Sequence, residues 1–209
     1  MRRPGSATLV ICATAAALTG ACSTIGFGIG SGSASSVTRG VNARTFTNEY
    51  PVRTFQSDSP VTADVYLTDF SDAELSSFFV EDPDWSALTG SIVQVRLFID
   101  PKPGSTPIDP TAVSAAIRMI VVARGEIGVY DGAGFLLPGG SIENGSISGS
   151  IRRAPIRLTR RTPGFRDPLA SPEIDLRFAV REDTGAADEL DARVDALSAA
   201  AQPIAAPGE

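Results

Sequence analysis

The sequence predicts an all-β fold, an antiparallel β-sandwich of about seven strands with a C-terminal α-helix. Several short runs alternate between apolar and polar residues, which is the pattern of a strand with one buried face. Proline and glycine separate these runs, as expected for turns. Near the C-terminus the apolar residues change to helical spacing. Short strands joined by turns are typical of two packed antiparallel sheets.

The three clearest predicted strands are residues 62–68, 91–99 and 173–181. In each, apolar side chains occupy every second position. The residues expected on the buried face are Ala63, Val65 and Leu67 in the first strand, Val93, Val95, Leu97 and Ile99 in the second, and Ile174, Leu176, Phe178 and Val180 in the third.

Residues 113–123 also alternate, and Arg124-Gly125 then offers a tight turn into residues 126–130, which predicts a hairpin. A helix is the alternative for this stretch. Asp109-Pro110 would begin it well, because proline is favoured at the first helical position. The β-branched residues crowded into 117–122 favour the strand.

Two helices are predicted. The first begins at Ser71, which forms a capping-box pattern with Glu74. The second covers about residues 186–200, with Glu189 and Arg193 spaced to form an ion pair within one turn. The residues expected on its buried face are Ala187, Leu190, Val194 and Leu197.

The N-terminus has the features of an export signal. Met1-Arg2-Arg3 is positively charged, and residues 7–18 are apolar or small but too few to span a bilayer. Leu18-Thr19-Gly20-Ala21-Cys22 then resembles the lipobox of bacterial lipoproteins, although Thr19 stands where leucine is more usual. The resemblance covers residues 1–22 and implies that Cys22 is lipidated. Ser23 after the cysteine implies an address at the outer membrane, facing the periplasm; the alternative is an ordinary secretory signal that leaves Cys22 a free thiol.

We therefore expect a signal peptide over 1–21, a lipidated flexible tether over 22–42, the β-domain over 43–200 and a disordered tail over 201–209. The tether is assigned from its serine and glycine content, because these residues bury too little apolar surface to offset the entropy of ordering the backbone. The tail is rich in alanine and proline.

The composition excludes several kinds of site. The net charge of −6 argues against nucleic acid as a partner, because phosphates require a basic face. The chain has no histidine, and its two cysteines are Cys12 within the signal and Cys22. Histidine-dependent catalytic triads and zinc sites are thus excluded, and we predict neither a cofactor nor an enzyme.

Six acidic residues fall within residues 69–84, next to the single tryptophan, Trp85. A solvated acidic loop is the favoured interpretation. Two carboxylates beside an aromatic residue could alternatively act on a polysaccharide. Asp82 and Asp84 are weak calcium candidates, because carboxylate oxygens suit Ca²⁺.

The basic residues gather between 152 and 166, where six arginines occur. A strand over 153–161 would place Arg153, Arg157 and Arg161 on one face, at every fourth residue. Such a row could bind an anion, although ion pairing with neighbouring acids and protection of a sheet edge are the more ordinary roles. The sequence thus favours a non-enzymatic, lipid-anchored protein of the cell envelope that binds or scaffolds another component, with an anionic envelope component or protein as the candidate partner. A polysaccharide-acting enzyme and a calcium-stabilised adhesion-type domain are the alternatives.

Overall fold

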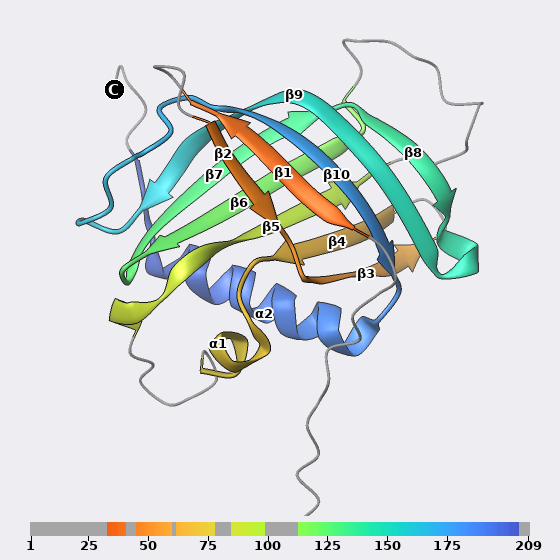
Figure 1. Ribbon diagram of the computed structural model, residues 1–209, viewed down its shortest axis with the longest axis horizontal. Coiled ribbons are helices and arrows are strands. Elements are labelled where there is room, and N and C mark those ends of the chain that lie inside the picture. The colour runs from red at the N-terminus through yellow and green to blue at the C-terminus, as the bar shows by residue number, and fades with distance from the viewer. Residues whose placement is uncertain (1–32, 41–44, 60–61, 78–84, 99–112, 205–209) are drawn as a thin grey trace, which may run out of the picture.

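The computed structural model describes residues 33–40, 45–59, 62–77, 85–98 and 113–204. Within them the chain forms one antiparallel sheet of eleven strands, which curls into a half-barrel with a long C-terminal helix beside it (Figure 1). The helices are α1 (Asp72–Ser77) and α2 (Thr184–Ala200), with short 3-10 turns η2 (Trp85–Ala87) and η3 (Ile142–Asn144). The strands are β1 (Ala34–Arg39), β2 (Thr45–Glu49), β3 (Val52–Ser59), β4 (Thr62–Thr68), β5 (Thr89–Leu97), β6 (Ala115–Ala123), β7 (Glu126–Gly134), β8 (Leu136–Ser141), β9 (Ser146–Arg161), β10 (Glu173–Arg181) and β11 (Gln202–Pro203).

The longest strand, β9, is hydrogen-bonded along both edges. Its first part, from Ser146 to Pro155, pairs with β10, and the other edge of this part pairs with β8. Its last part pairs with β7, while Arg160 and Arg161 pair with β11. The first part of β9 together with β8, β10, β1 and β2 is called the β10 half of the sheet. The strands β7, β6, β5, β4 and β3 form the β6 half.

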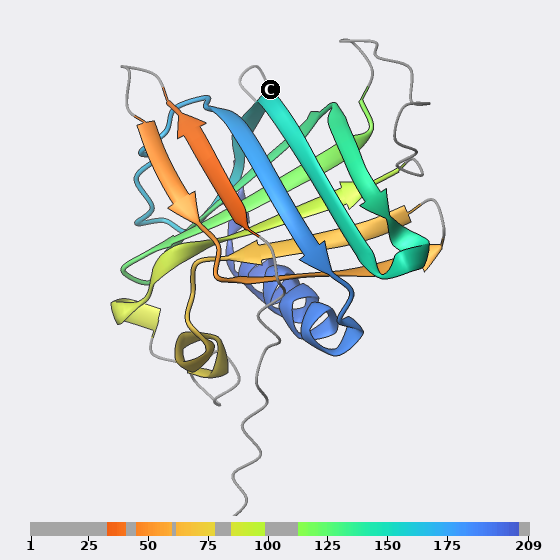
Figure 2. The ribbon, with the colours of Figure 1, turned by 45° about the vertical axis from the view of Figure 1, so that its right-hand side comes forward.

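The half-barrel curls until its far edge meets the end of β10. Figure 2 shows β3 passing beside the end of that strand. The Asp183 N–H donates to the Phe55 carbonyl at 3.1 Å, and the Thr54 hydroxyl donates to the Arg181 carbonyl at 3.3 Å. Backbone and side-chain groups of β3 thus fix the start of α2 against the sheet.

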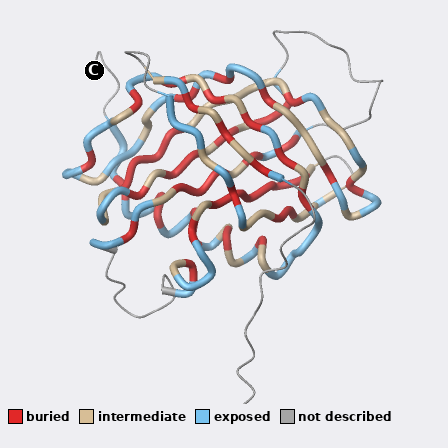
Figure 3. The backbone as a smooth tube through the Cα atoms, viewed as in Figure 1, coloured by how far each residue is buried: buried red, intermediate tan, exposed pale blue. Residues whose placement is uncertain are grey.

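The main core fills the inside of the half-barrel, and buried positions concentrate there (Figure 3). Alternation along each strand directs every second side chain inward. The β6 half contributes the inner faces of β4, β5 and β6, and the β10 half contributes those of β9 and β10. The predicted buried residues of the three clearest strands lie in this core, except Ile99, which is outside the described residues.

A second core lies between the β6 half and the helices. Here Tyr66, Ile92 and Ile120 on the sheet contact the cluster that includes Leu190 and Val194 of α2. Burying a leucine or valine side chain contributes about 1.5–3 kcal/mol, so this face holds α2 in place. The β6 half is therefore apolar on both faces, which is why residues 113–123 resemble a helix as much as a strand in sequence.

The strand prediction for this stretch is confirmed by β6, and so is the hairpin that follows it. The turn residues Arg124 and Gly125 have φ angles of 53° and 78°. Both lie in the left-handed region that a two-residue hairpin turn requires. Glycine adopts this conformation without the steric cost that a Cβ atom imposes.

Helix α1 begins as predicted from its capping box, whereas α2 begins at Thr184, two residues before its predicted start near residue 186. The Ser71 N–H donates to the Glu74 carboxylate at 2.8 Å, which completes the capping box of α1. The Asp183 side chain accepts from the Ala186 N–H at 3.0 Å and caps α2. The predicted pair between Glu189 and Arg193 is present at 3.7 Å.

Arg193 is buried, although its spacing in the sequence indicated only a favourable pair along the helix. Its Nε and Nη2 atoms donate to the Leu75 carbonyl at 3.2 and 3.0 Å. The arginine thus joins α2 to the end of α1. Burial lowers its pKa, and Glu189 partly offsets that effect.

The structure corrects three sequence predictions. The all-β class and the C-terminal helix are confirmed, but the strands form a curled sheet of eleven and not a sandwich of about seven. Residues 34–39, predicted as part of the flexible tether, form β1, because Ser36 and Thr38 fill inward positions beside Ala34. Residues 202–203, predicted as part of the disordered tail, pair with β9 as β11.

The three tyrosines provide a test of the two cores. Burial raises the pKa of Tyr50 to about 12. Burial also raises the pKa values of Tyr66 and Tyr130, as do the hydrogen bonds that their hydroxyls donate to Asp191 and Asp167. Because these folded-state pKa values exceed the ordinary value of about 10, the stability they provide is complete below that pH and is lost as pH rises through the folded-state values.

We expect the tyrosinate absorbance to rise in one cooperative step, together with the loss of the β-sheet circular dichroism signal. An alkaline titration that follows both signals checks this expectation. Tyrosine ionisation near pH 10, at about its ordinary value, with an intact β-sheet signal would contradict the burial described here.

Candidate functional site

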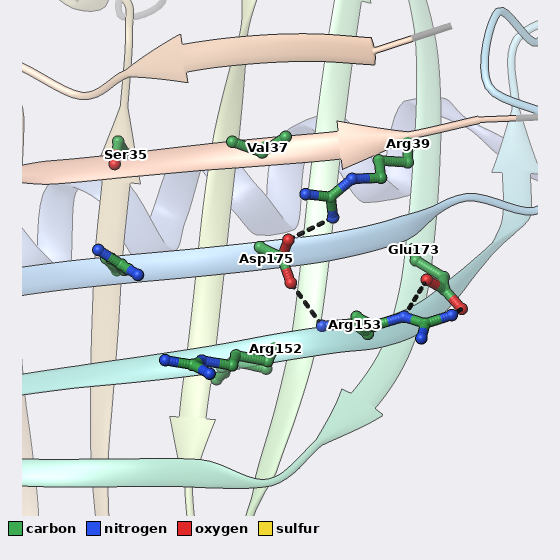
Figure 4. A pocket seen from close by; sticks show the side chains of 9 residues that line it. Ser35, Val37, Arg39, Arg152, Arg153, Glu173 and Asp175 are labelled. Atoms are coloured by element: carbon green, nitrogen blue, oxygen red, sulfur yellow. Dashed lines mark hydrogen bonds and ion pairs between the residues drawn. The ribbon is translucent and has the colours of Figure 1, made fainter. Parts of the chain in front are cut away.

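The outer face of the β10 half is hollowed by an open groove of about 710 Å³ (Figure 4). Cross-strand pairs place Arg39 opposite Glu173, and Ser35 opposite Arg177. These side chains point away from the core, since their neighbours Ser36 and Leu176 are buried. We call this hollow the arginine groove; it is lined by Ser35, Val37, Arg39, Ile151, Arg152, Arg153, Glu173, Asp175 and Arg177.

A β-bulge in β9 builds the centre of the arginine groove. The register between β9 and β10 shifts beside Asp175, so Arg152 and Arg153 together oppose that one residue. Consecutive residues of a regular strand point to opposite faces, but both of these arginines are exposed. Arg153 has a φ of 49°, in the left-handed region where glycine is usual.

Asp175 and Glu173 hold this bulge in place. The Asp175 Oδ1 atom accepts from the Arg153 backbone N–H at 2.7 Å, and its Oδ2 atom pairs with Arg39. The Arg153 guanidinium donates to both Glu173 oxygens, at 2.9 and 3.2 Å. Figure 4 shows these bonds linking β1, β10 and β9 across the floor of the groove.

The pKa values of both carboxyl groups reflect their partners. The Arg153 hydrogen bonds lower the pKa of Glu173. Burial would raise the pKa of Asp175, but the hydrogen bonds from Arg39 and from the Arg153 N–H outweigh it and lower the pKa. Both acids therefore stay ionised at neutral pH and keep Arg39 and Arg153 oriented.

The other two arginines of the groove lack such partners. Among the described residues, Arg152 and Arg177 make no hydrogen bond or ion pair with a side chain, although the charge of Arg152 helps to lower the pKa of Asp175. Figure 4 shows the Arg152 side chain extending away from Glu173. Four guanidinium groups thus meet two carboxylates, which leaves the groove with a positive excess on an acidic chain. Guanidinium groups bind phosphate and carboxylate oxygens through paired hydrogen bonds.

The predicted row of Arg153, Arg157 and Arg161 is not formed, because a second bulge interrupts it. Between Arg157 and Arg161 the register of β9 with β7 shifts by one residue at Thr159. Arg157 pairs with Asp131, whereas Arg161 pairs with Gly128, three positions away along β7 and thus on the opposite face. Of the three predicted arginines, the arginine groove contains Arg153 alone.

Sequence reasoning missed the contributions of Arg39 and Arg177. Arg177 could have been found, since the alternation of residues 173–181 already placed it on the polar face beside Asp175. Arg39 lay in the stretch assigned to the tether, where no strand was expected. Its place opposite Glu173 depends on β1 joining the sheet.

The acidic region 69–84 is described only up to Ser77. Asp72 is exposed, Glu74 caps α1, and Asp69 lies at a separate cavity. The described acids therefore do not converge as a pair in one cleft. Asp82 and Asp84, like Cys22, fall outside the described residues; within the described ones, no group of three or more acids could hold a metal ion.

The bulge predicts how substitutions of Arg153 rank in stability. Arg153→Gly and Arg153→Val both remove the guanidinium, but glycine accepts a positive φ whereas valine clashes with its own backbone there. We expect Arg153→Val to unfold at a clearly lower urea concentration than Arg153→Gly. Equal midpoints in urea unfolding would show that the left-handed bulge is not retained.

In the part of the chain that the structure describes, no helix is long and apolar enough to cross a membrane. Comparison of the chain with protein-family models, with curated proteins and with solved structures finds no match. The function must therefore be inferred from the geometry of the arginine groove and from the sequence.

Proposed function

We propose that the chain is a non-enzymatic, lipid-anchored protein of the cell envelope whose domain binds an anionic partner in the arginine groove. The observation that carries this proposal is the pair of arginines, Arg152 and Arg177, that form no ion pair or hydrogen bond with a described carboxylate, on a sheet face that no helix of the described residues covers. An arginine whose role was only to protect a strand could just as well form an ion pair with a nearby acid. Here the two available acids, Glu173 and Asp175, are already bonded to Arg153 and Arg39.

The paired arginines support the same role. Because Arg39 and Arg153 are held by hydrogen bonds, they lose little further conformational freedom when an anion binds. Arg152 and Arg177 supply the donors for the ligand. The positive excess also steers a polyanion toward this face and away from the exposed acids of α2, Asp188 and Asp195.

The location is proposed from the N-terminal sequence, with Cys22 as the lipidated residue and the outer membrane, facing the periplasm, as the address. Eleven residues separate Cys22 from β1. Tethering of this kind raises the effective concentration of a membrane-bound partner to about the millimolar range. A modest affinity of the groove for such a partner is then sufficient for binding.

Among the alternatives, an enzyme acting on polysaccharide would need two acids in one cleft. Of the described acids in the region 69–84, Asp69 lines the cavity that contains Phe46 and Asn48, and neither Asp72 nor Glu74 lines it with Asp69. This favours the binding role over the catalytic one.

The anion-binding role is tested by replacing the two available arginines. Arg152→Ser with Arg177→Ser should weaken binding to vesicles containing anionic phospholipid, or to isolated cell-wall fragments, by roughly 30-fold at low salt, at about 1 kcal/mol for each arginine. Wild-type binding should also fall as salt is added, because ions screen the groove. Sedimentation with vesicles or wall fragments measures both effects.

The matched control is Arg157→Ser with Arg161→Ser, which removes the same charge outside the arginine groove. This control should keep most of the wild-type binding. Equal losses in the two double variants would mean that only net charge matters. Unchanged binding in Arg152→Ser with Arg177→Ser would refute the groove as the site.

The anchor is tested by Cys22→Ser. Without the thiol no lipid can be attached, so we expect the protein to move from the membrane fraction to the soluble fraction and to lose incorporation of labelled palmitate. Ser23→Ala is the control and should leave both unchanged. Palmitate labelling that persists in Cys22→Ser would overturn the assignment.

A further inference from the structure

A second cavity, of about 320 Å³, lies between the two halves of the sheet and apart from the arginine groove. Phe46 and Asn48 of β2 line it from the β10 half, and Ser91 and Met119 line it from the β6 half. Asp69, which follows β4, lies at its polar end with Asn48 and Ser91. We call this hollow the Asp69 cavity.

The Asp69 carboxylate is bonded only by neutral donors among the described residues. Its Oδ1 atom accepts from the Ser91 N–H at 2.6 Å. Its Oδ2 atom accepts from Asn48 Nδ2 and from Ser91 Oγ, both at 3.0 Å. Neither an arginine nor a lysine of the described chain forms an ion pair with it. A partly buried negative charge is thus held in position but not neutralised.

Burial raises the pKa of Asp69, hydrogen bonds from Ser91 oppose this effect, and the nearby Glu74 adds to it. The cost of desolvating the carboxylate is therefore only partly offset within the described protein. A cation in the Asp69 cavity would offset it further, because an opposite charge close by favours the ionised form.

The rest of the Asp69 cavity is mostly apolar, with Thr38 and Thr89 as its other polar residues. Met119 and Leu169 are buried there, and Phe46 remains 39 % exposed at its surface. An apolar pocket with a few convergent polar groups and one perturbed acid is a common form of ligand site. Its volume lies at the small end of the range for such sites, about 300–1,000 Å³.

We propose that the Asp69 cavity binds a small cationic amphiphile, with a protonated amine on the Asp69 carboxylate and an apolar body against Phe46, Met119 and Leu169. The charge of Asp69 selects against a ligand carboxylate, since two like charges would meet in a partly desolvated space. A neutral alcohol could make a hydrogen bond there but would leave the charge uncompensated. This site does not depend on the arginine groove or on the lipid anchor.

Three probes of similar shape test the selectivity: 2-phenylethylamine, 2-phenylethanol and 3-phenylpropanoate. Isothermal titration of the full chain at neutral pH should show binding of the amine at least about tenfold tighter than binding of the alcohol, since a hydrogen bond to a charged group contributes about 1.5–3 kcal/mol. The carboxylate probe should not bind. Equal binding of amine and alcohol, or no binding of the amine, would overturn the proposal.

Asp69→Asn tests the residue, with Asp72→Asn on exposed α1 as the matched control. The first should reduce amine affinity to that of the alcohol, and the second should leave it unchanged. Asp69→Asn places an amide against the donors of Asn48 and Ser91, which costs stability. Phe46→Ala therefore provides a second variant, on a half-exposed side chain.

Phe46→Ala should weaken both the amine and the alcohol severalfold while retaining the preference for the amine. Wild-type amine affinity in either Phe46→Ala or folded Asp69→Asn would show that the amine binds elsewhere on the protein. The Asp69 network would then serve only to join β2 to β5.

Discussion

Hydrogen bonding along both edges of β9 holds the two halves of the sheet together. One edge pairs with β8 and β7 in succession, and the other pairs with β10 and then β11. The strand must change direction between the two halves, and its bulges lie at Arg152–Arg153 and near Thr159. Bulges bend a strand and increase its local twist. The same irregularity that curls the sheet therefore turns two neighbouring arginines outward into the arginine groove.

The two halves of the sheet differ in what covers their outer faces. The β6 half is covered by α2 and α1, fixed by apolar contacts and by the buried Arg193. The β10 half carries charged and hydroxyl side chains on its outer face. The exposed acids of α2 and the arginines of β9 and β10 thus occupy different sides of an acidic protein. This separation of charge gives the domain a preferred orientation toward an anionic surface.

Regular elements were predictable from the sequence, whereas elements that break a simple period were not. The strands with strict alternation, the first helix with its capping box and the second helix with its apolar face were found, because local pattern and tertiary structure agree there. β1 was missed because its inward positions hold Ala34, Ser36 and Thr38, which give no apolar signal. The predicted row of Arg153, Arg157 and Arg161 is not formed, because strict alternation along a strand cannot anticipate an inserted residue in β9. The Asp69 cavity combines residues from five separated stretches of the chain, so no local pattern could assemble it.

The position of β1 within the sheet affects how the domain would respond to mechanical load. A lipid at Cys22 would transmit any pull from the membrane to the start of β1, which is hydrogen-bonded to β10 on one edge and to β2 on the other. Force along the axis of a strand paired on both edges loads many hydrogen bonds in shear at once. An outermost strand pulled sideways would instead separate one bond at a time. With the proposed lipid at Cys22, this attachment point would favour resistance to extraction over easy peeling.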